Sequence, residues 1–496
     1  MTETSTAPLR DDPAAGGAAA SADRMNPRDR LAVTVLLVST FVVILNETIM
    51  GVALPRLMTD LSITASTAQW LTTAFMLTMA VVIPVTGFVL QRITTRPAFL
   101  LAMGMFALGT LICALAPGFV VLLSGRIVQA VGTAIMLPLL MTTVMTVTPV
   151  ASRGRTMGNI SVVISVAPAI GPTISGLILS VLSWRWMFGL VLPIAIAAIV
   201  LGATRLPNVT EPRYAKVDVV SVILSALGFG GIVYGLSGLG EITDGGVAPT
   251  TWVAIGVGVV TLVAFVLRQR SLAKVDDALL DLRVFSSRTF AVSVALLAGL
   301  MVSLFGVIIL LPIYAQTVLG LTTLQTGLLL LPGGLLMGLL APGVGRAYDR
   351  LGPRPLLIPG AVALSLAFWG FVLLQPDSSP WWVLAAHMTM SAGLALMFTP
   401  LFTSALGSLP AHRYSHGSAV VGTLQQVAGA AGTALFVTVL TAQSAALADG
   451  GATATASVAG GVHSAFLVGA VLSLVTVPVA LLVPAKPFVA EPGSHH

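Results

Sequence analysis

The chain has 496 residues, of which 56% are hydrophobic and only 8% are charged. Soluble domains carry about 25% charged residues, so this composition excludes a water-soluble globular protein and indicates an integral membrane protein. The formal net charge of +6 does not indicate nucleic-acid binding, because in a membrane protein the position of the basic residues matters more than their sum. The single cysteine, Cys113, excludes an intramolecular disulfide and a cysteine-based metal site. No metal or cofactor is expected.

Long apolar runs dominate the chain after its first residues. Residues 1–29 are rich in Ala, Gly, Ser and Asp and are predicted to be a disordered cytoplasmic tail. Beyond them, apolar runs alternate with short polar breaks, and about 20 helical residues suffice to cross a 30 Å hydrocarbon core. An all-α membrane protein with fourteen transmembrane helices is therefore predicted. The expected spans are 31–54, 67–90, 98–116, 119–148, 156–182, 186–204, 217–239, 250–267, 289–318, 323–345, 355–375, 380–408, 416–442 and 462–484.

Basic residues lie almost entirely in alternate breaks between these spans. Of the 24 Lys and Arg residues, 21 lie on the side of the N-terminus, Arg56 and Arg185 lie on the other side, and Arg126 lies inside a span. Cytoplasmic loops of membrane proteins are enriched in Lys and Arg. The skew predicts an even number of spans, with both termini in the cytoplasm, in a protein of the inner (plasma) membrane.

A short pattern recurs 258 residues further along the chain. Pro84, Gly87, Arg92, Arg96 and Pro97 recur as Pro342, Gly345, Arg350, Arg354 and Pro355. The copies fall eight spans apart, whereas two homologous six-helix halves alone would place them six apart. Paired bundles are common in secondary transporters. The predicted layout is an N-terminal six-helix bundle (30–206), two inserted helices (207–270), a cytoplasmic linker (271–288), a C-terminal six-helix bundle (289–485) and a C-terminal tail (486–496).

Several local motifs occur in a characteristic order. They are LNETIMGVALPRLMTDL (45–61), RIVQAVG (126–132), APAIGPTISG (167–176), SWRWMF (183–188) and GRAYDRLGPR (345–354). Together they resemble the fourteen-helix drug:proton antiporter branch of the major facilitator superfamily. The resemblance implies the major facilitator fold, and it implies an exporter motif at Gly171, Pro172 and Gly176. It also implies a cytoplasmic gating motif at Gly87, Arg92, Arg96, Gly345, Asp349, Arg350, Gly352 and Arg354. In the first copy Gln91 replaces the expected aspartate, which predicts a weaker latch.

Glu47 is the acidic residue placed deepest within a predicted span. A carboxylate inside a bilayer costs at least about 2.5 kcal/mol, so such a residue is either paired locally or used. Burial favours the neutral form of a carboxyl group, which predicts that Glu47 binds and releases a proton; a permanently paired, structural glutamate is the alternative. Arg126 lies at a similar depth, about 10–12 Å below the outer surface. We predict that it approaches Glu47 in one state and leaves it in another, whereas a purely structural arginine is the alternative.

The implied central cavity is mostly apolar with scattered hydrogen-bonding groups. Its candidate lining residues are Asn46, Met50, Trp70, Gln129, Phe305, Tyr314, His387 and Gln425. Such a surface suits lipophilic substrates, although packing or lipid contact is the alternative for each residue. The position 258 after Glu47 is Phe305, so the second half has no matching carboxylate. His387 can titrate, but a hydrogen-bonded packing role is expected for it.

None of the three lysines follows a glycine, so the sequence contains no P-loop for binding nucleotide phosphates. Nucleotide hydrolysis is therefore not the expected energy source. The predicted function is a proton-coupled exporter of lipophilic or cationic small molecules, a multidrug efflux protein working by alternating access. A dedicated exporter of one endogenous natural product or lipid is the alternative. A channel or non-transporting receptor is less favoured, and an enzyme is not expected because the sequence contains no catalytic constellation. The expected partners are the lipid bilayer, protons and lipophilic substrates, with no nucleic acid, and the expected state is a monomer.

Overall fold

Fourteen long α-helices make up the computed structural model, which describes residues 26–63, 65–209, 218–239 and 248–485. The helices are α2 (Pro27–Leu61), α3 (Ala65–Arg92), α4 (Thr95–Ala114), α5 (Phe119–Val147), α6 (Arg153–Val181), α7 (Arg185–Arg205), α8 (Val219–Leu239), α9 (Pro249–Leu272), α10 (Arg288–Ile313), α11 (Thr323–Leu351), α12 (Arg354–Val372), α13 (Pro380–Gly407), α14 (Tyr414–Asp449) and α15 (Ala454–Ala480). In the described part, thirteen are long and apolar enough to cross a membrane, and α6 is the exception. The predicted all-α fold is confirmed.

Local capping explains where some helices depart from the predicted bounds. The first helix begins at Pro27 rather than 31, because the Asn26 side chain accepts a hydrogen bond from the Arg28 N–H at 3.1 Å and proline suits the first helical position. The last helix begins at 454 rather than 462, since the Thr453 hydroxyl accepts a hydrogen bond from the Ala456 N–H at 3.3 Å. The predicted tails before residue 26 and after residue 485 lie outside the described residues.

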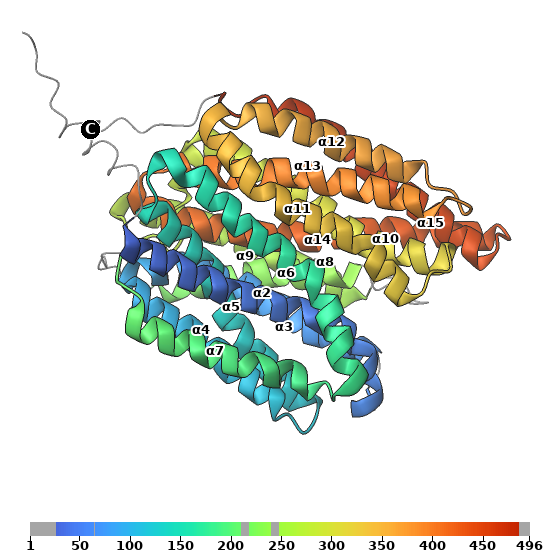
Figure 1. Ribbon diagram of the computed structural model, residues 1–496, viewed down its shortest axis with the longest axis horizontal. Helices are drawn as coiled ribbons and strands as arrows, with labels where there is room; N and C mark the ends of the chain where they lie inside the picture. Colours follow the sequence, from blue (N-terminus) through green and yellow to red (C-terminus); the bar gives the residue numbers. More distant parts are fainter. Residues whose placement is uncertain (1–25, 64, 210–217, 240–247, 486–496) are drawn as a thin grey trace, which may run out of the picture.

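The helices pack as two groups with a pair beside them. Helices α2 to α7 pack on one another, and α10 to α15 form a second group. Figure 1 shows the first group in blue to green and the second in yellow to red. Helices α8 and α9, which fall within the predicted insertion 207–270, pack on each other, and α8 also packs on α3 and α14. One helix of the pair therefore contacts both groups.

Arginines gather at one end of the molecule, here called the basic end. They are Arg92, Arg96, Arg153, Arg155, Arg205, Arg346, Arg350 and Arg413, which lie at the helix termini and loops of that end. The opposite end, here called the far end, carries Arg56 and Arg185 near its helix termini. The positions in the structure thus reproduce the alternation of basic residues along the sequence.

Helix α6 meets α11 along what we call the first seam. The two helices approach so closely that a Cβ atom on Gly345 would lie 2.2 Å from the Gly154 carbonyl oxygen. One turn further along, a Cβ atom on Gly158 would lie 2.5 Å from the carbonyl oxygen of Ala341. Only glycine permits backbones to come this close. The first seam is therefore closed at the basic end.

Helix α3 meets α14 along what we call the second seam. A Cβ atom on Gly87 would lie 3.1 Å from the Ala419 Cβ atom. The Gln91 side chain donates a hydrogen bond to the His412 carbonyl oxygen, with a nitrogen–oxygen distance of 3.2 Å. Both seams thus close the basic end of the molecule. The hydrophobic core contains side chains from both groups of helices.

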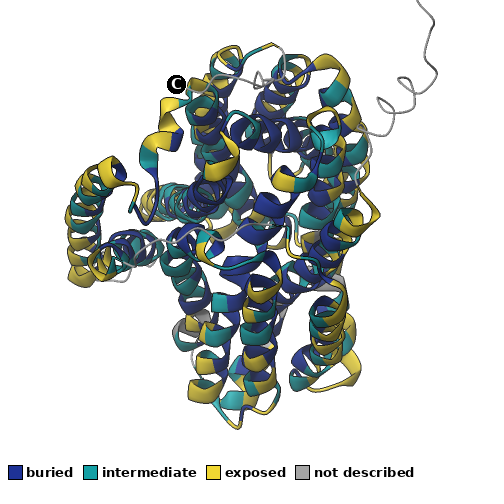
Figure 2. Cartoon of the chain, turned by 90° about the vertical axis from the view of Figure 1, so that its left-hand side faces the viewer, coloured by how far each residue is buried: buried dark blue, intermediate teal, exposed yellow. Residues whose placement is uncertain are grey.

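The outer surface is strongly apolar. Figure 2 shows a buried centre surrounded by helices whose outward faces are exposed. Exposed side chains include Leu339 at 80% of its surface, Trp381 at 76% and Val120 at 73%. Water-facing surfaces do not carry this many large apolar side chains, whereas the hydrocarbon of a bilayer accepts them. The surface is that of a multi-pass membrane protein.

Candidate functional site

A buried arginine network joins α2, α3, α4 and α5. The Arg126 guanidinium donates to Gln129 Oε1 at 2.6 Å and to Asn46 Oδ1 at 3.4 Å. Gln129 donates in turn to the Thr110 hydroxyl at 2.8 Å. The guanidinium carbon lies 4.1 Å from the centre of the Phe75 ring, a cation–π distance. Arg126 is 1% exposed, and these neutral groups help to stabilise its charge.

Glu47 lies one residue after Asn46 on α2 and is half-buried. The charge of Arg126 acts on the Glu47 carboxyl group, yet among the described residues no ion pair joins the two. Within the same described part, Arg126 Nε and Asn46 Nδ2 are buried without a hydrogen-bond partner. The site therefore holds free donors beside a carboxyl group. The predicted switch between paired and separate states stays a prediction, and this conformation is the separate one.

Helix α6 packs on α2 directly beside Glu47. A Cβ atom on Gly171 would lie 2.3 Å from the Thr48 hydroxyl oxygen, so a larger residue there would displace the Thr48 side chain. The Ser175 hydroxyl donates to the Ile49 carbonyl oxygen at 3.0 Å. Of the other two residues of the predicted exporter motif, Gly176 is exposed with nothing near its Cβ position, and the surroundings of Pro172 lie outside the described residues. The same α6 forms the first seam with α11, so it connects the Glu47 region to the closure of the basic end.

Three predicted lining residues take no part in the hydrogen bonds or the cation–π contact of the arginine network. Met50 is 1% exposed and packs in an apolar cluster with residues such as Trp184. Trp70 is 41% exposed, and its ring lies 6.0 Å from that of Tyr234 on α8. Tyr314 is buried at the π-helical turn that follows α10, where its hydroxyl donates to the Gln375 carbonyl oxygen. In this conformation these side chains serve packing rather than a common site.

The remaining candidates belong to the second group of helices. The His387 ring packs on Gly333, and its Nε2 atom lies 3.2 Å from the Leu330 carbonyl oxygen. A hydrogen-bonded packing role for His387 stays a prediction. Phe305 is partly buried against Gly429 of α14. Gln425 is half-buried on α14.

Asp349 of the gating motif joins the two groups of helices. Its carboxylate accepts hydrogen bonds from the Gly154 N–H at 2.7 Å and from the Arg155 N–H at 2.8 Å. These N–H groups belong to the first turn of α6, where backbone donors lack partners within the helix. A carboxylate at a helix N-terminus is also favoured by the helix dipole. Asp349 thus acts across the first seam as a cap for α6.

The other residues of the gating motif lie around helix ends. Gly352 has φ +80° and ends α11, a conformation that favours glycine. The Arg354 guanidinium donates to the Val483 and Leu481 carbonyl oxygens just after α15, at 2.8 and 2.7 Å. Arg92, Arg96 and Arg350 are exposed at the basic end.

Sequence reasoning did not identify Phe75 and Thr110 as part of the arginine network. Both belong to ordinary apolar spans, and nothing in their local sequence distinguishes them from packing residues. The sequence alone could place Gln129 beside Arg126, because residues three apart on a helix share a face. The contact of Phe75 with Arg126 depends on how α3 packs on α5, which only the structure reveals.

Two groups of helices that meet along two seams, with a charged residue buried inside the first group, form the architecture expected of a membrane transporter. The chain belongs to the Major Facilitator Superfamily, whose family model matches residues 36–433.

Relatives and solved structures agree with this assignment. The lincomycin resistance protein LmrB of Bacillus subtilis is 40% identical over 82% of this chain and 84% of its own length. The multidrug resistance protein B homolog of Mycobacterium tuberculosis is 30% identical over 80% of this chain and 73% of its own. The human organic anion transporter MFSD10 has a similar fold, with a TM-score of 0.63 over 92% of this chain and all of its own, at 15% identity. At that identity the likeness concerns the fold alone.

Proposed function

We propose that the protein is a proton-coupled exporter of lipophilic or cationic small molecules, that is, a drug:proton antiporter. The observation that carries the proposal is Glu47, a half-buried carboxyl group beside Arg126 that has no ion pair in the described part of the chain. An ionisable residue inside a membrane span is functional by default. Relatives named for lincomycin resistance and multidrug resistance support a drug as the exported substrate.

The proposed orientation places the basic end in the cytoplasm, with both termini there. It is supported by the 21 of 24 basic residues on that side of the sequence. The two seams close the basic end. With this orientation, the described conformation is closed toward the cytoplasm, and we assign it to the outward-facing state of the cycle.

Arg126 is the proposed moving charge of the transport cycle. In the outward-facing conformation it is bound by Gln129 and Phe75, which leaves Glu47 to take a proton from the outside. In the inward-facing conformation Arg126 turns to Glu47, and an arginine at ion-pair distance favours the charged carboxylate. The proton then leaves to the cytoplasm while substrate binds. Protons thus enter as substrate leaves, by alternating access.

The test is the Glu47→Gln variant in proteoliposomes with an imposed pH gradient, using lincomycin and a panel of lipophilic cations. Glutamine keeps the size of the side chain and removes the titratable group. We expect substrate binding to persist and gradient-driven transport to disappear. The matched control is Asp60→Asn, which removes a carboxylate from the same helix where it pairs with exposed Arg56 at 3.3 Å, and it should transport normally. Gradient-driven transport that survives in Glu47→Gln would disprove the proposed role.

A further inference from the structure

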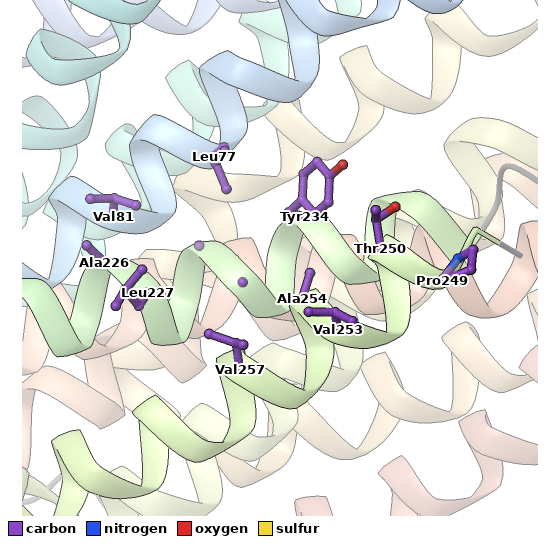
Figure 3. A pocket seen from close by; sticks show the side chains of 12 residues that line it. Leu77, Val81, Ala226, Leu227, Tyr234, Pro249, Thr250, Val253, Ala254 and Val257 are labelled. Carbon is purple, nitrogen blue, oxygen red and sulfur yellow. The ribbon is translucent and has the colours of Figure 1, made fainter.

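An apolar groove lies on the outside of the helix bundle between α3, α8 and α9 (Figure 3). Its volume is about 540 Å³. Leu77 and Val81 of α3 form one wall, and α8 and α9 supply the rest. The only polar side chains among the lining residues are Tyr234 and Thr250. This groove is separate from the Glu47 site, since none of its lining residues belongs to the arginine network.

Small side chains create the groove. Helix α9 packs tightly on α8, since a Cβ atom on Gly231 would lie 2.9 Å from the Ala254 carbonyl oxygen. Helix α9 has no extensive contact with α3. Ala226, Gly230 and Ala254 face the space left between them. Larger residues at these positions would fill the groove.

The position of the groove indicates what occupies it. Three of its lining side chains belong to the outward surface, with Val253 exposed by 64%, Leu227 by 48% and Val257 by 44%. In a membrane protein this surface faces hydrocarbon. Apolar cavities do not hold water, and an empty space forfeits the dispersion contacts of its walls. The surrounding medium supplies one suitable occupant, a lipid acyl chain.

The dimensions and the polar end of the groove fit one lipid leaflet. The lining residues of α8 extend from Ala226 to Tyr234, which is about 12 Å of helix at about 1.5 Å per residue. Half of a hydrocarbon core about 30 Å thick is about 15 Å. Figure 3 shows the Tyr234 and Thr250 hydroxyls together at one end of the groove, with apolar side chains along the remainder. That end is the far end, where α8 finishes and α9 begins.

We propose that this groove binds one acyl chain of a phospholipid, with the polar part of the lipid at Tyr234 and Thr250. The Trp70 ring, 6.0 Å from that of Tyr234, strengthens this assignment, because Trp and Tyr concentrate at membrane–water interfaces. The lipid belongs to the outer leaflet, a detail that rests on the orientation given under the proposed function. The bound chain packs between α3 of the first helix group and the α8/α9 pair, so it completes the contact that α9 does not make.

The test is photolabelling of the full chain in proteoliposomes with a phosphatidylcholine that carries a diazirine on one acyl chain. Adducts mapped after proteolysis should concentrate several-fold on the groove segments of α3, α8 and α9. The reference surface is α15, where Val471 and Val475 are exposed by 54% and 58% but line no part of the groove. Groove labelling should saturate as the fraction of photolipid rises, whereas labelling of α15 should rise in proportion. Saturation needs no variant, so it tests the proposal even if a variant misfolds.

A matched pair of variants tests the position of the chain. The double variant Ala226→Phe, Ala254→Phe fills the groove and should reduce its labelling to the level of α15. Gly256→Phe adds the same side chain to the outward face of α9, where a Cβ atom would have no neighbour within 4 Å, and should leave groove labelling unchanged. Equal, non-saturating labelling of the groove and α15 would overturn the proposal. So would displacement of the photolipid by saturating lincomycin, which would make the groove a drug site. Glu47→Gln should label like the wild type, so this result is independent of proton coupling.

Discussion

The two seams that close the basic end are related by the 258-residue repeat, yet they are held together differently. Asp349 and Gln91 occupy equivalent positions in the two copies. Asp349 caps α6 through two hydrogen bonds from N–H groups, whereas Gln91 donates a hydrogen bond to the His412 carbonyl oxygen. Hydrogen bonds to a charged group are stronger than neutral ones. The first seam therefore has the stronger polar latch.

The second seam has a different support. Helix α8 packs on both α3 and α14, the two helices of that seam, while neither α8 nor α9 packs extensively on α6 or α11. The inserted pair thus lies along the seam whose latch lacks a carboxylate. The two groups of helices are thus held together by an acidic side chain at the first seam and by a packed helix at the second. These two contacts differ in strength and in what must change for the seam to open.

Removing the Asp349 carboxylate from the first seam should have the largest effect on the closure of the basic end. Asp349→Ala leaves the N–H groups of Gly154 and Arg155 without their cap. Losing such a cap costs about 2 kcal/mol, which is about a 30-fold change in the equilibrium between conformations. We expect the basic end to open and transport to fall. Distances between spin labels on the basic ends of α6 and α11 measure the opening. Asp349→Asn, which keeps one neutral acceptor, should show a smaller change, and wild-type closure in this variant would contradict the role of the charge.

The replacement of the acid by Gln91 is visible in the sequence, whereas the contacts made at each seam are not. The repeat and the motif around Asp349 were readable because glycine, proline and charge recur at fixed spacing. The N–H groups that Asp349 caps belong to the backbone of α6, so the side chains of Gly154 and Arg155 do not reveal this contact in the sequence. Likewise Glu47 and Arg126 stood out as ionisable residues in apolar spans. The contact of Phe75 with Arg126 depends on how α3 packs on α5. The apolar sequences of the two helices do not determine this packing.

Installing a carboxylate in the second seam should have an intermediate effect. Gln91→Asp places an acid beside the turn Ala411–Arg413 that leads into α14, at the position equivalent to Asp349. A new cap at a partly exposed position contributes about 1 kcal/mol, or about five-fold in the equilibrium. The basic end should stay closed for longer, and turnover should slow without loss of substrate binding. Gln91→Asn is the control, since it shortens the side chain in the same way without adding charge. Turnover reduced equally in both variants would show that the lost bond to His412, rather than the new charge, is responsible.

The smallest effect is expected at the basic end of the inserted pair. Asp218 accepts hydrogen bonds from the Arg268 side chain at 2.6 and 2.8 Å and also from Ser221. The hydrogen bonds from Arg268 lower the pKa of Asp218 to about 2, against an opposing effect of burial and with a further contribution from Ser221. A carboxyl group with a lowered folded-state pKa stabilises the fold above its ordinary value, and this stability is lost only as the pH falls toward the folded value.

Asp218→Asn removes this contribution at every pH above the ordinary pKa of an aspartate. The variant should therefore lower the Tm slightly, and by the same amount at each pH between about 5 and 8, because the wild-type carboxylate stays charged throughout that range. Thermal unfolding of the purified protein across that range measures the difference. A difference that shrinks on acidification within this window would show that Asp218 takes up its proton far earlier than its contacts with Arg268 imply. In that case the ionic bond between α8 and α9 would not be what keeps the inserted pair aligned along the second seam.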